Sequence, residues 1–178
     1  LSAHAAACGV TVDQALEAAG YDARGGLALV PHYEEPWRSG DPAELPLVMT
    51  DFKSPYNLEG RSANLGLYQQ LTGPDCLRLN PSDMSALGLR DGDEVRVVSA
   101  TGSIVTQALS WDGVNPGVAG KCYGQGHWAY GHIAAADFER AVPRGGNNNE
   151  LHPYRKEGFS SASARNGGLT RIRVERVG

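Results

Sequence analysis

The segment best suited to binding a ligand is residues 124–131, with the sequence GQGHWAYG. Its glycines carry no side chain, so backbone amides there can approach a phosphate or a flat ring closely. Gln125 and His127 add hydrogen-bonding groups, and Trp128 adds a ring that can stack. The segment is therefore a candidate ligand loop. A tight turn whose aromatic rings close the end of a barrel would have the same composition.

A second candidate is the asparagine string at residues 147–149, which follows Gly145 and Gly146. An asparagine side chain presents a hydrogen-bond donor and an acceptor together, which suits the edge of a heterocyclic base. Asn147 and Asn149 are the candidates here, although asparagines are also frequent in plain turns.

A third candidate is a group of charged and hydroxyl side chains downstream of an apolar run. These groups could bind a pyrophosphate through charge and hydrogen bonds, and a solvated loop would look similar. The group consists of Lys53, Ser54, Arg61, Ser62 and Asn64.

A metal site held by the protein is not indicated. His127, His132 and His152 have no metal-ligand spacing, and neither a cysteine nor a pair of carboxylates stands beside them. The three cysteines are too far apart for a CxxC site and odd in number, so we expect buried thiols without a disulfide framework. No Gly-x-Ser-x-Gly elbow of a serine hydrolase occurs.

Charge and hydropathy exclude several classes of partner. The formal net charge is -4 without a dense stripe of Lys and Arg, which argues against nucleic acid and anionic membranes as partners. No apolar run reaches the roughly 18 residues of a membrane span. The chain shows no signal peptide and begins at Leu1 in mid-pattern, so we expect a fragment of a longer protein.

The elements that position these residues are short. With 23 glycines and 10 prolines, the chain has many turns, and long helices cannot dominate. Thr11 and Gln14 form a capping box for a helix that Gly20 ends, and Asn80 with Pro81 opens a second helix. Strand patterns occur at residues 45–50, 76–79, 94–99, 104–109, 118–123 and 170–177.

This pattern predicts a mostly β protein with short helices, folded as a small closed barrel of about six strands. Residues 1–44 are expected to form a lead-in segment with a short helix, and residues 45–178 the barrel domain.

Several motifs in fixed order carry a family resemblance. They are residues 46–50 (PLVMT), 60–62 (GRS), 80–83 (NPSD), 87–93 (LGLRDGD), 115–118 (NPGV) and 126–131 (GHWAYG). In this order they resemble the molybdopterin dinucleotide-binding domain, the C-terminal domain of catalytic subunits in the dimethyl sulfoxide reductase family. The last motif and GGNNNE at residues 145–150 look most like the tetrathionate, arsenate and polysulfide or thiosulfate reductase branch. The resemblance implies a double-psi β-barrel.

The resemblance also implies roles for individual residues in binding cofactor. One group would hold the nucleotide and phosphate end: Thr50, Lys53, Ser54, Arg61, Ser62 and Asn64. Asn80 and Asp83 would bind guanine or ribose. The last group would contact the pterin end: Gln125, His127, Trp128, Asn147 and Asn149. No residue of this chain is expected to be catalytic or to bind the metal.

The function implied is that of one wall of a bis(molybdopterin guanine dinucleotide) pocket with molybdenum or tungsten. The enzyme would transfer electrons and an oxygen or sulfur atom, the cofactor supplying the chemistry. Its iron–sulfur cluster would lie in other domains of the same catalytic subunit, and an iron–sulfur electron-transfer subunit would be a partner. The branch suggests the periplasm, with the cytoplasm left open, and the fragment alone is expected to be inactive.

Two other functions are compatible with the same residues. A double-psi barrel can also serve as a binding or adaptor module without cofactor, because fold does not determine function. A small hydrolase or decarboxylase on a related barrel would need a nucleophile and a base, which the sequence does not reveal.

Overall fold

The computed structural model describes residues 1–21, 29–33, 35–156 and 168–178. The chain divides into two compact units. The first comprises Leu1–Pro36 and Tyr154–Arg165, and the second Trp37–Pro153 and Asn166–Gly178.

In its described residues the first unit contains the short α-helices α1 (Ser2–Ala7) and α2 (Val12–Ala18). The predicted capping box of α2 is confirmed. The Thr11 hydroxyl accepts a hydrogen bond from the Gln14 backbone N–H at 3.1 Å, and the Gln14 side chain accepts one from the Thr11 N–H at 2.9 Å. α1 was not predicted, since no side chain caps its start.

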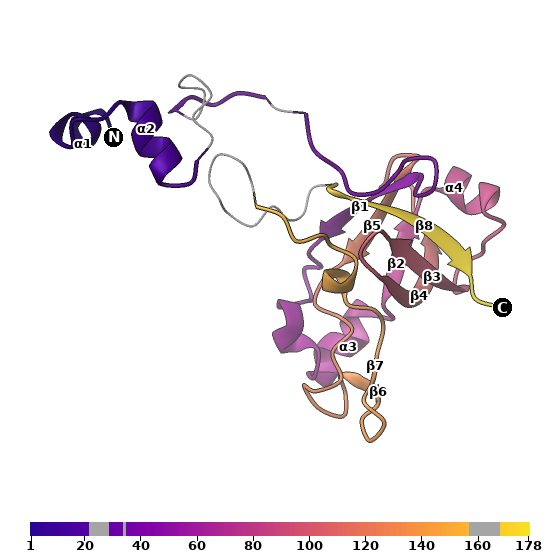
Figure 1. The fold of residues 1–178 in the computed structure, drawn as a ribbon. Coiled ribbons are helices and arrows are strands. Elements are labelled where there is room, and N and C mark those ends of the chain that lie inside the picture. Colours follow the sequence, from indigo (N-terminus) through magenta and orange to yellow (C-terminus); the bar gives the residue numbers. More distant parts are fainter. Residues whose placement is uncertain (22–28, 34, 157–167) are drawn as a thin grey trace. The chain divides into compact units, whose positions relative to one another are not determined.

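Six strands form a closed barrel in the second unit (Figure 1). The strands are β1 (Leu47–Phe52), β2 (Cys76–Leu79), β3 (Glu94–Ser99), β4 (Ser103–Ser110), β5 (Val118–Cys122) and β8 (Thr170–Arg176). Their order around the barrel is β1-β5-β2-β4-β3-β8. The β1–β5 and β2–β4 pairs are parallel, and the other four pairs are antiparallel. The predicted mostly β, six-stranded barrel is confirmed.

Strand bounds differ little from those predicted. The largest difference is in β1, which begins at Leu47 rather than residue 45 and continues to Phe52. The Leu45 N–H is used in a turn, donating to the Asp41 carbonyl at 2.8 Å, and Pro46 has no N–H to donate. At the other end, Asp51 and Phe52 pair with Lys121 and Cys122 of β5.

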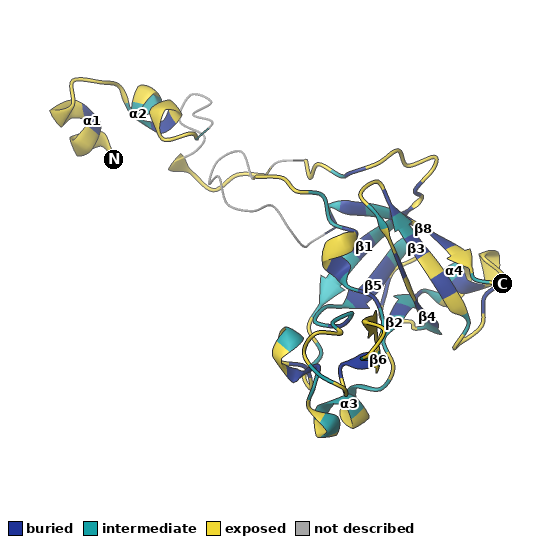
Figure 2. Cartoon of the chain, turned by 60° about the horizontal axis from the view of Figure 1, so that its bottom comes forward, coloured by how far each residue is buried: buried dark blue, intermediate teal, exposed yellow. Residues whose placement is uncertain are grey.

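The barrel core consists mainly of inward-facing residues that alternate along each of the six strands, with Met84, Leu89 and Leu151 added from the connections; buried residues are dark blue in Figure 2. Alternation arises because successive side chains of a strand point to opposite faces. β2 shows it clearly, with Leu77 and Leu79 fully buried and Cys76 and Arg78 half-buried. Burying each leucine stabilises the fold by about 1.5–3 kcal/mol.

The connections contain the remaining elements. η2 (Glu59–Ser62) and α3 (Gly66–Thr72) lie between β1 and β2, and α4 (Pro81–Ala86) follows β2. A two-stranded sheet of β6 (Ala135–Asp137) and β7 (Val142–Pro143) and the turn η3 (Asn148–Glu150) follow β5. α3 and this sheet lie beyond the same end of the barrel (Figures 1 and 2).

α4 is the second predicted helix, and its start is as expected. The Asn80 side chain accepts a hydrogen bond from the Ser82 N–H at 3.0 Å, with Pro81 in the first turn. α3 was not predicted, because it has neither a capping side chain nor a buried residue that would mark an apolar face. In the described residues no helix is long and apolar enough to cross a membrane.

The three cysteines are free thiols. The expectation that all three are buried is wrong. Cys8 is exposed at the end of α1, where only Ala5 is buried, and Cys76 and Cys122 are half-buried.

Candidate functional site

Parallel pairing of β1 and β5 places the loops that follow these strands side by side. Phe52 and Cys122, the last residues of the two strands, are paired. The Asn57 side chain donates a hydrogen bond across the two loops to the Tyr123 carbonyl at 2.9 Å, and it accepts one from the Ser62 hydroxyl at 2.6 Å. Asn57 is buried and therefore joins the loops structurally.

Two glycines of the 124–131 segment allow three loops to meet. Gly124 has φ +91°, and a Cβ there would lie 2.8 Å from the Cα of Glu59. Gly126 has φ +78°, and a Cβ there would overlap the backbone nitrogen of Asn147. No other residue type fits both the conformation and the space at these positions. We call residues 53–64, 124–131 and 145–149 the loop cluster.

A cavity of about 400 Å³ lies where two loops of the cluster, residues 124–131 and 145–149, meet. It is lined by Gly126, His127, Trp128, Ala129, Tyr130, Ala141, Pro143, Asn147 and Glu150. Three residues predicted to contact the pterin therefore share one cavity: His127, Trp128 and Asn147. A larger cavity of about 600 Å³ lies beside β4, but no predicted site residue lines it.

His127 is placed to exchange hydrogen bonds with a ligand. Its ring packs against that of Tyr130 at a tilt of 33°, with centroids 4.6 Å apart, and burial lowers the pKa of the imidazole. The ring is therefore neutral at pH 7, when one nitrogen donates and the other accepts. Trp128, 43% exposed, offers a ring face beside it.

The asparagine string divides into exposed and buried members. Asn149 is exposed, and Asn147 is half-buried and accepts a hydrogen bond from the Asn149 N–H at 3.1 Å. Asn148, which was not predicted, is buried and donates to the Asp51 carboxylate at 2.7 Å. Its Oδ1 is buried without a hydrogen-bond partner in the described part of the chain. Gln125, also predicted, is buried.

The predicted residues of the first loop fall into two kinds. Lys53 and Arg61 are exposed, with Lys53 3.8 Å from Glu59, so their charges face solvent. Ser62 and Asn64 use their side chains within the fold. The Asn64 oxygen accepts hydrogen bonds from the Ile133 and Ala134 N–H groups at 2.9 and 3.2 Å.

The other two predicted residues on this side are half-buried. Thr50 lies within β1 opposite Gly120. Ser54 accepts a hydrogen bond from the Tyr56 N–H at 3.3 Å.

Asn80 and Asp83 lie away from the predicted site residues of the loop cluster. β2 is antiparallel to β5 and pairs Leu79 with Ala119, so Asn80 lies near the start of β5, whereas the loop cluster follows its end. Asn80 donates to the Val114 carbonyl at 2.8 Å, and Asp83 accepts from the Gly117 N–H at 2.8 Å.

Sequence reasoning missed the buried polar residues Asn57, Asp75, Lys121 and Asn148. Lys121 had one visible signal, since a charged residue inside the apolar strand pattern of β5 must find a partner when the strand is buried. Its partner could not be read from the sequence.

The described residues hold no group of three His, Cys, Asp or Glu side chains that could bind a metal ion. Cys76 is a poor nucleophile as well, because burial and the Asp75 carboxylate raise the pKa of its thiol.

The family model described as the molydopterin dinucleotide binding domain matches residues 47–166. The chain belongs to this family. Membership confirms the resemblance to the dinucleotide-binding domain of the dimethyl sulfoxide reductase family, and the match covers the loop cluster and both parallel strand pairs.

Relatives of this dinucleotide-binding domain are parts of much longer proteins. The chain is 46% identical over 99% of its length to the molybdopterin-containing subunit of arsenate respiratory reductase from Chrysiogenes arsenatis, and covers 22% of that protein. Identity to the same subunit from Shewanella sp. (strain ANA-3) is 45%, covering 99% of this chain and 21% of that protein. The chain thus spans about a fifth of the length of these relatives.

Among solved structures, acetylene hydratase from Pelobacter acetylenicus has the same fold. The TM-score is 0.66 at 14% sequence identity, over 91% of this chain and 22% of that one.

Proposed function

We propose that this chain is the cofactor-binding domain of the catalytic subunit of a molybdenum or tungsten oxidoreductase, and that it holds molybdopterin guanine dinucleotide. The observation that carries the proposal is the convergence of two loops of the loop cluster, residues 124–131 and 145–149, on one cavity. His127, Trp128 and Asn147 line that cavity, although they come from two separate loops.

The groups present fit such a ligand. A pterin has a flat ring with a row of donors and acceptors on its edge, which matches a stacking ring, a neutral imidazole and amides. Gly126 brings the backbone of the 124–131 segment against Asn147, so that the two loops form one surface. The unpaired buried oxygen of Asn148 belongs to the same turn.

We assign the pterin end to Gln125, His127, Trp128, Asn147 and Asn149. The nucleotide and phosphate end is assigned to Thr50, Lys53, Ser54, Arg61, Ser62 and Asn64, where Lys53 and Arg61 offer exposed positive charges to phosphates. Asn80 and Asp83 remain the proposed guanine or ribose contacts. Their place near the start of β5 requires the dinucleotide to extend away from the loop cluster.

When bound, the cofactor would supply oxygen- or sulfur-atom transfer and electron transfer at its metal. The residues of this chain bind and orient it. His127, kept neutral by burial, can hold a hydrogen bond at the pterin edge without adding charge near the metal. Trp128 and Tyr130 line the cavity and would border the bound ring.

The complete protein, in this proposal, binds two molybdopterin guanine dinucleotides around one metal and carries an iron–sulfur cluster in its other domains. An iron–sulfur electron-transfer subunit is the proposed partner, and the periplasm the proposed compartment. Identity of 46% to a subunit of arsenate respiratory reductase supports an oxyanion such as arsenate as substrate.

The test is metal and pterin analysis of the complete gene product, purified from a host that makes the cofactor. We expect about one metal ion and two pterins per polypeptide, with the pterin measured by its fluorescence after oxidation and release. Protein that is folded but free of pterin would overturn the proposal and favour an adaptor module. Arsenate, tetrathionate and thiosulfate, assayed with a reduced dye, then decide the substrate.

A further inference from the structure

Lys121 of β5 is completely buried, which is unusual for a lysine. Its ammonium lies 2.6 Å from the Asp75 carboxylate, whose side chain is 3% exposed. Removing both charges from water is costly, and apolar residues of similar size often stabilise a core as well or better. We therefore expect the ion pair to have a role other than packing in the core.

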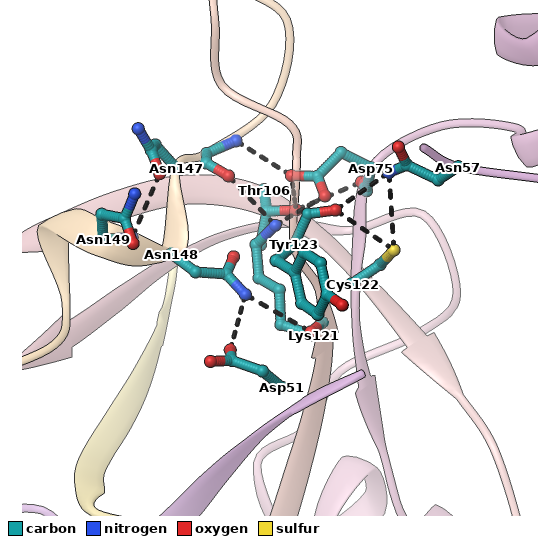
Figure 3. Close-up of polar contacts among 11 residues, drawn as sticks. Asp51, Asn57, Asp75, Thr106, Lys121, Cys122, Tyr123, Asn147, Asn148 and Asn149 are labelled. Carbon is teal, nitrogen blue, oxygen red and sulfur yellow. Dashed lines mark hydrogen bonds and ion pairs between the residues drawn. The ribbon is translucent and has the colours of Figure 1, made fainter. Parts of the chain in front are cut away.

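The ion pair holds both backbone polar groups of one residue, Gly146, and so fixes the two peptide units on either side of it. The Lys121 ammonium donates a hydrogen bond to the Gly146 carbonyl at 3.1 Å. The Gly146 N–H donates to the second Asp75 oxygen at 2.9 Å. The Thr106 hydroxyl donates to the same oxygen at 2.9 Å, which fixes the orientation of the carboxylate. Figure 3 shows these contacts around the side chains of Asp75 and Lys121.

Gly146 is the residue before the asparagine string, so this contact determines where the string starts. A second set of contacts fixes the middle residue of the string, Asn148. The Asn148 amide donates to the Lys121 carbonyl at 3.3 Å and to the Asp51 carboxylate at 2.7 Å (Figure 3). Lys121 therefore anchors the turn with its side chain and with its backbone, while Asn147 borders the cavity.

We infer that Lys121 and Asp75 are positioning residues for cofactor binding: their buried ion pair fixes Gly146 so that Asn147 and Asn149 face the ligand. This inference rests on the proposed function. The pair sets the geometry of residues 145–149, and its charges are not needed for the stability of the barrel.

Two double variants of the complete gene product separate these roles. Lys121→Met/Asp75→Leu removes the charges and every side-chain hydrogen bond to Gly146 while keeping apolar bulk. Lys121→Gln/Asp75→Asn removes the charges but keeps one donor and one acceptor for Gly146. The measured quantity is the rate at which pterin is released into the filtrate during timed incubation, and limited proteolysis reports folding.

We expect Lys121→Met/Asp75→Leu to release pterin about tenfold faster than the wild type, since both side-chain hydrogen bonds to the backbone of Gly146 are lost. Lys121→Gln/Asp75→Asn should stay within about threefold of the wild type. The control is Arg173→Gln/Glu175→Gln, which removes an exposed ion pair of the same 2.6 Å length on β8 and should release pterin at the wild-type rate.

Wild-type protein without pterin would contradict the proposed function. Wild-type protein with pterin, together with unchanged release from folded Lys121→Met/Asp75→Leu, would contradict only the positioning role. If that variant does not fold, Thr106→Val replaces it, because it removes only the hydroxyl that orients Asp75. Faster release from Thr106→Val supports the inference, and an unchanged rate overturns it.

Discussion

The two ends of β5 carry different kinds of polar contact. Near its start, Asn80 caps α4 through Ser82, two residues away, and Asn80 and Asp83 also bond to Val114 and Gly117, each 34 residues away. After its end, contacts join segments far apart in the chain: Asn57 with Tyr123, Asp75 with Gly146, and Asp51 with Asn148. The cap of α4 is a local contact that forms within its own segment, whereas the loop cluster depends on the closed barrel.

The comparison shows that similar polar strings have different roles. The Asn80 and Asp83 side chains form hydrogen bonds that hold the fold together. Asn80 bonds to the Val114 carbonyl, and Asp83 bonds to the Gly117 N–H in the turn before β5. His127 and Asn147 border a cavity. Four predictions test this difference, from the largest expected effect to the smallest.

Lys121→Met alone should have the largest effect on stability. It leaves the Asp75 carboxylate buried without its cation, which costs about 3–5 kcal/mol of unfolding free energy. The measurement is urea unfolding of the 178-residue chain. A loss below about 1 kcal/mol, the value typical of an exposed pair, would mean that Asp75 is not desolvated.

Gly126→Ala should destabilise the chain by about 2–3 kcal/mol and disorganise the cavity, since the new Cβ meets Asn147 in addition to the strain of positive φ. Gly92→Ala is the matched control, because Gly92 has φ +85° but no atom within 4 Å of an added Cβ. It should lose only about 1 kcal/mol. Equal losses in urea unfolding would argue against close packing of the two loops at Gly126.

Asn80→Ala should lower the unfolding free energy by about 1 kcal/mol, the usual value of a helix cap. Asn80→Asp, which keeps an accepting oxygen for the Ser82 N–H, should lose less. In the complete gene product we expect pterin content to fall less in Asn80→Ala than in Gly126→Ala. The reverse order would move the main binding contacts to the start of β5.

His127→Gln should weaken the pH dependence of stability. Burial lowers the pKa of His127 below its ordinary value of 6.5, so the unfolded chain takes up the proton first as the pH falls. The stabilising contribution is complete above about pH 6.5 and is lost as the pH decreases toward the folded-state pKa.

The urea midpoint of the wild type should therefore decrease more than that of His127→Gln between about pH 7.5 and 5.5. Parallel curves for the two proteins would show that His127 protonates equally in the folded and unfolded chains.

The sequence alone determined the features that depend on near neighbours. The capping box at Thr11, the start of α4 at Asn80, the alternation in β2 and the turn between β3 and β4 rest on local hydrogen bonds or on strand periodicity. Helix α3 was missed because it has no cap and no buried face.

The candidate ligand strings were also visible in the sequence, because glycine, asparagine and aromatic residues in a polar segment are conspicuous. The sequence did not show which residues of these strings face a ligand and which have a structural role. Ser62 and Asn64 stand in the same polar segment as Lys53 and Arg61, and the sequence gives no way to separate them. In the structure, however, the side chains of Ser62 and Asn64 form hydrogen bonds within the fold.

Only the tertiary structure decided which strings meet. Parallel pairing of β1 with β5 brings the loop after residue 52 beside the loop after residue 122, and the Lys121–Asp75 pair brings Gly146 to them. The physical reason is that the buried Lys121 ammonium must pair with a carboxylate that closure of the barrel brings close to it. That carboxylate belongs to Asp75, 46 residues away in the chain. Spacing in the sequence carries no signal for such a pair.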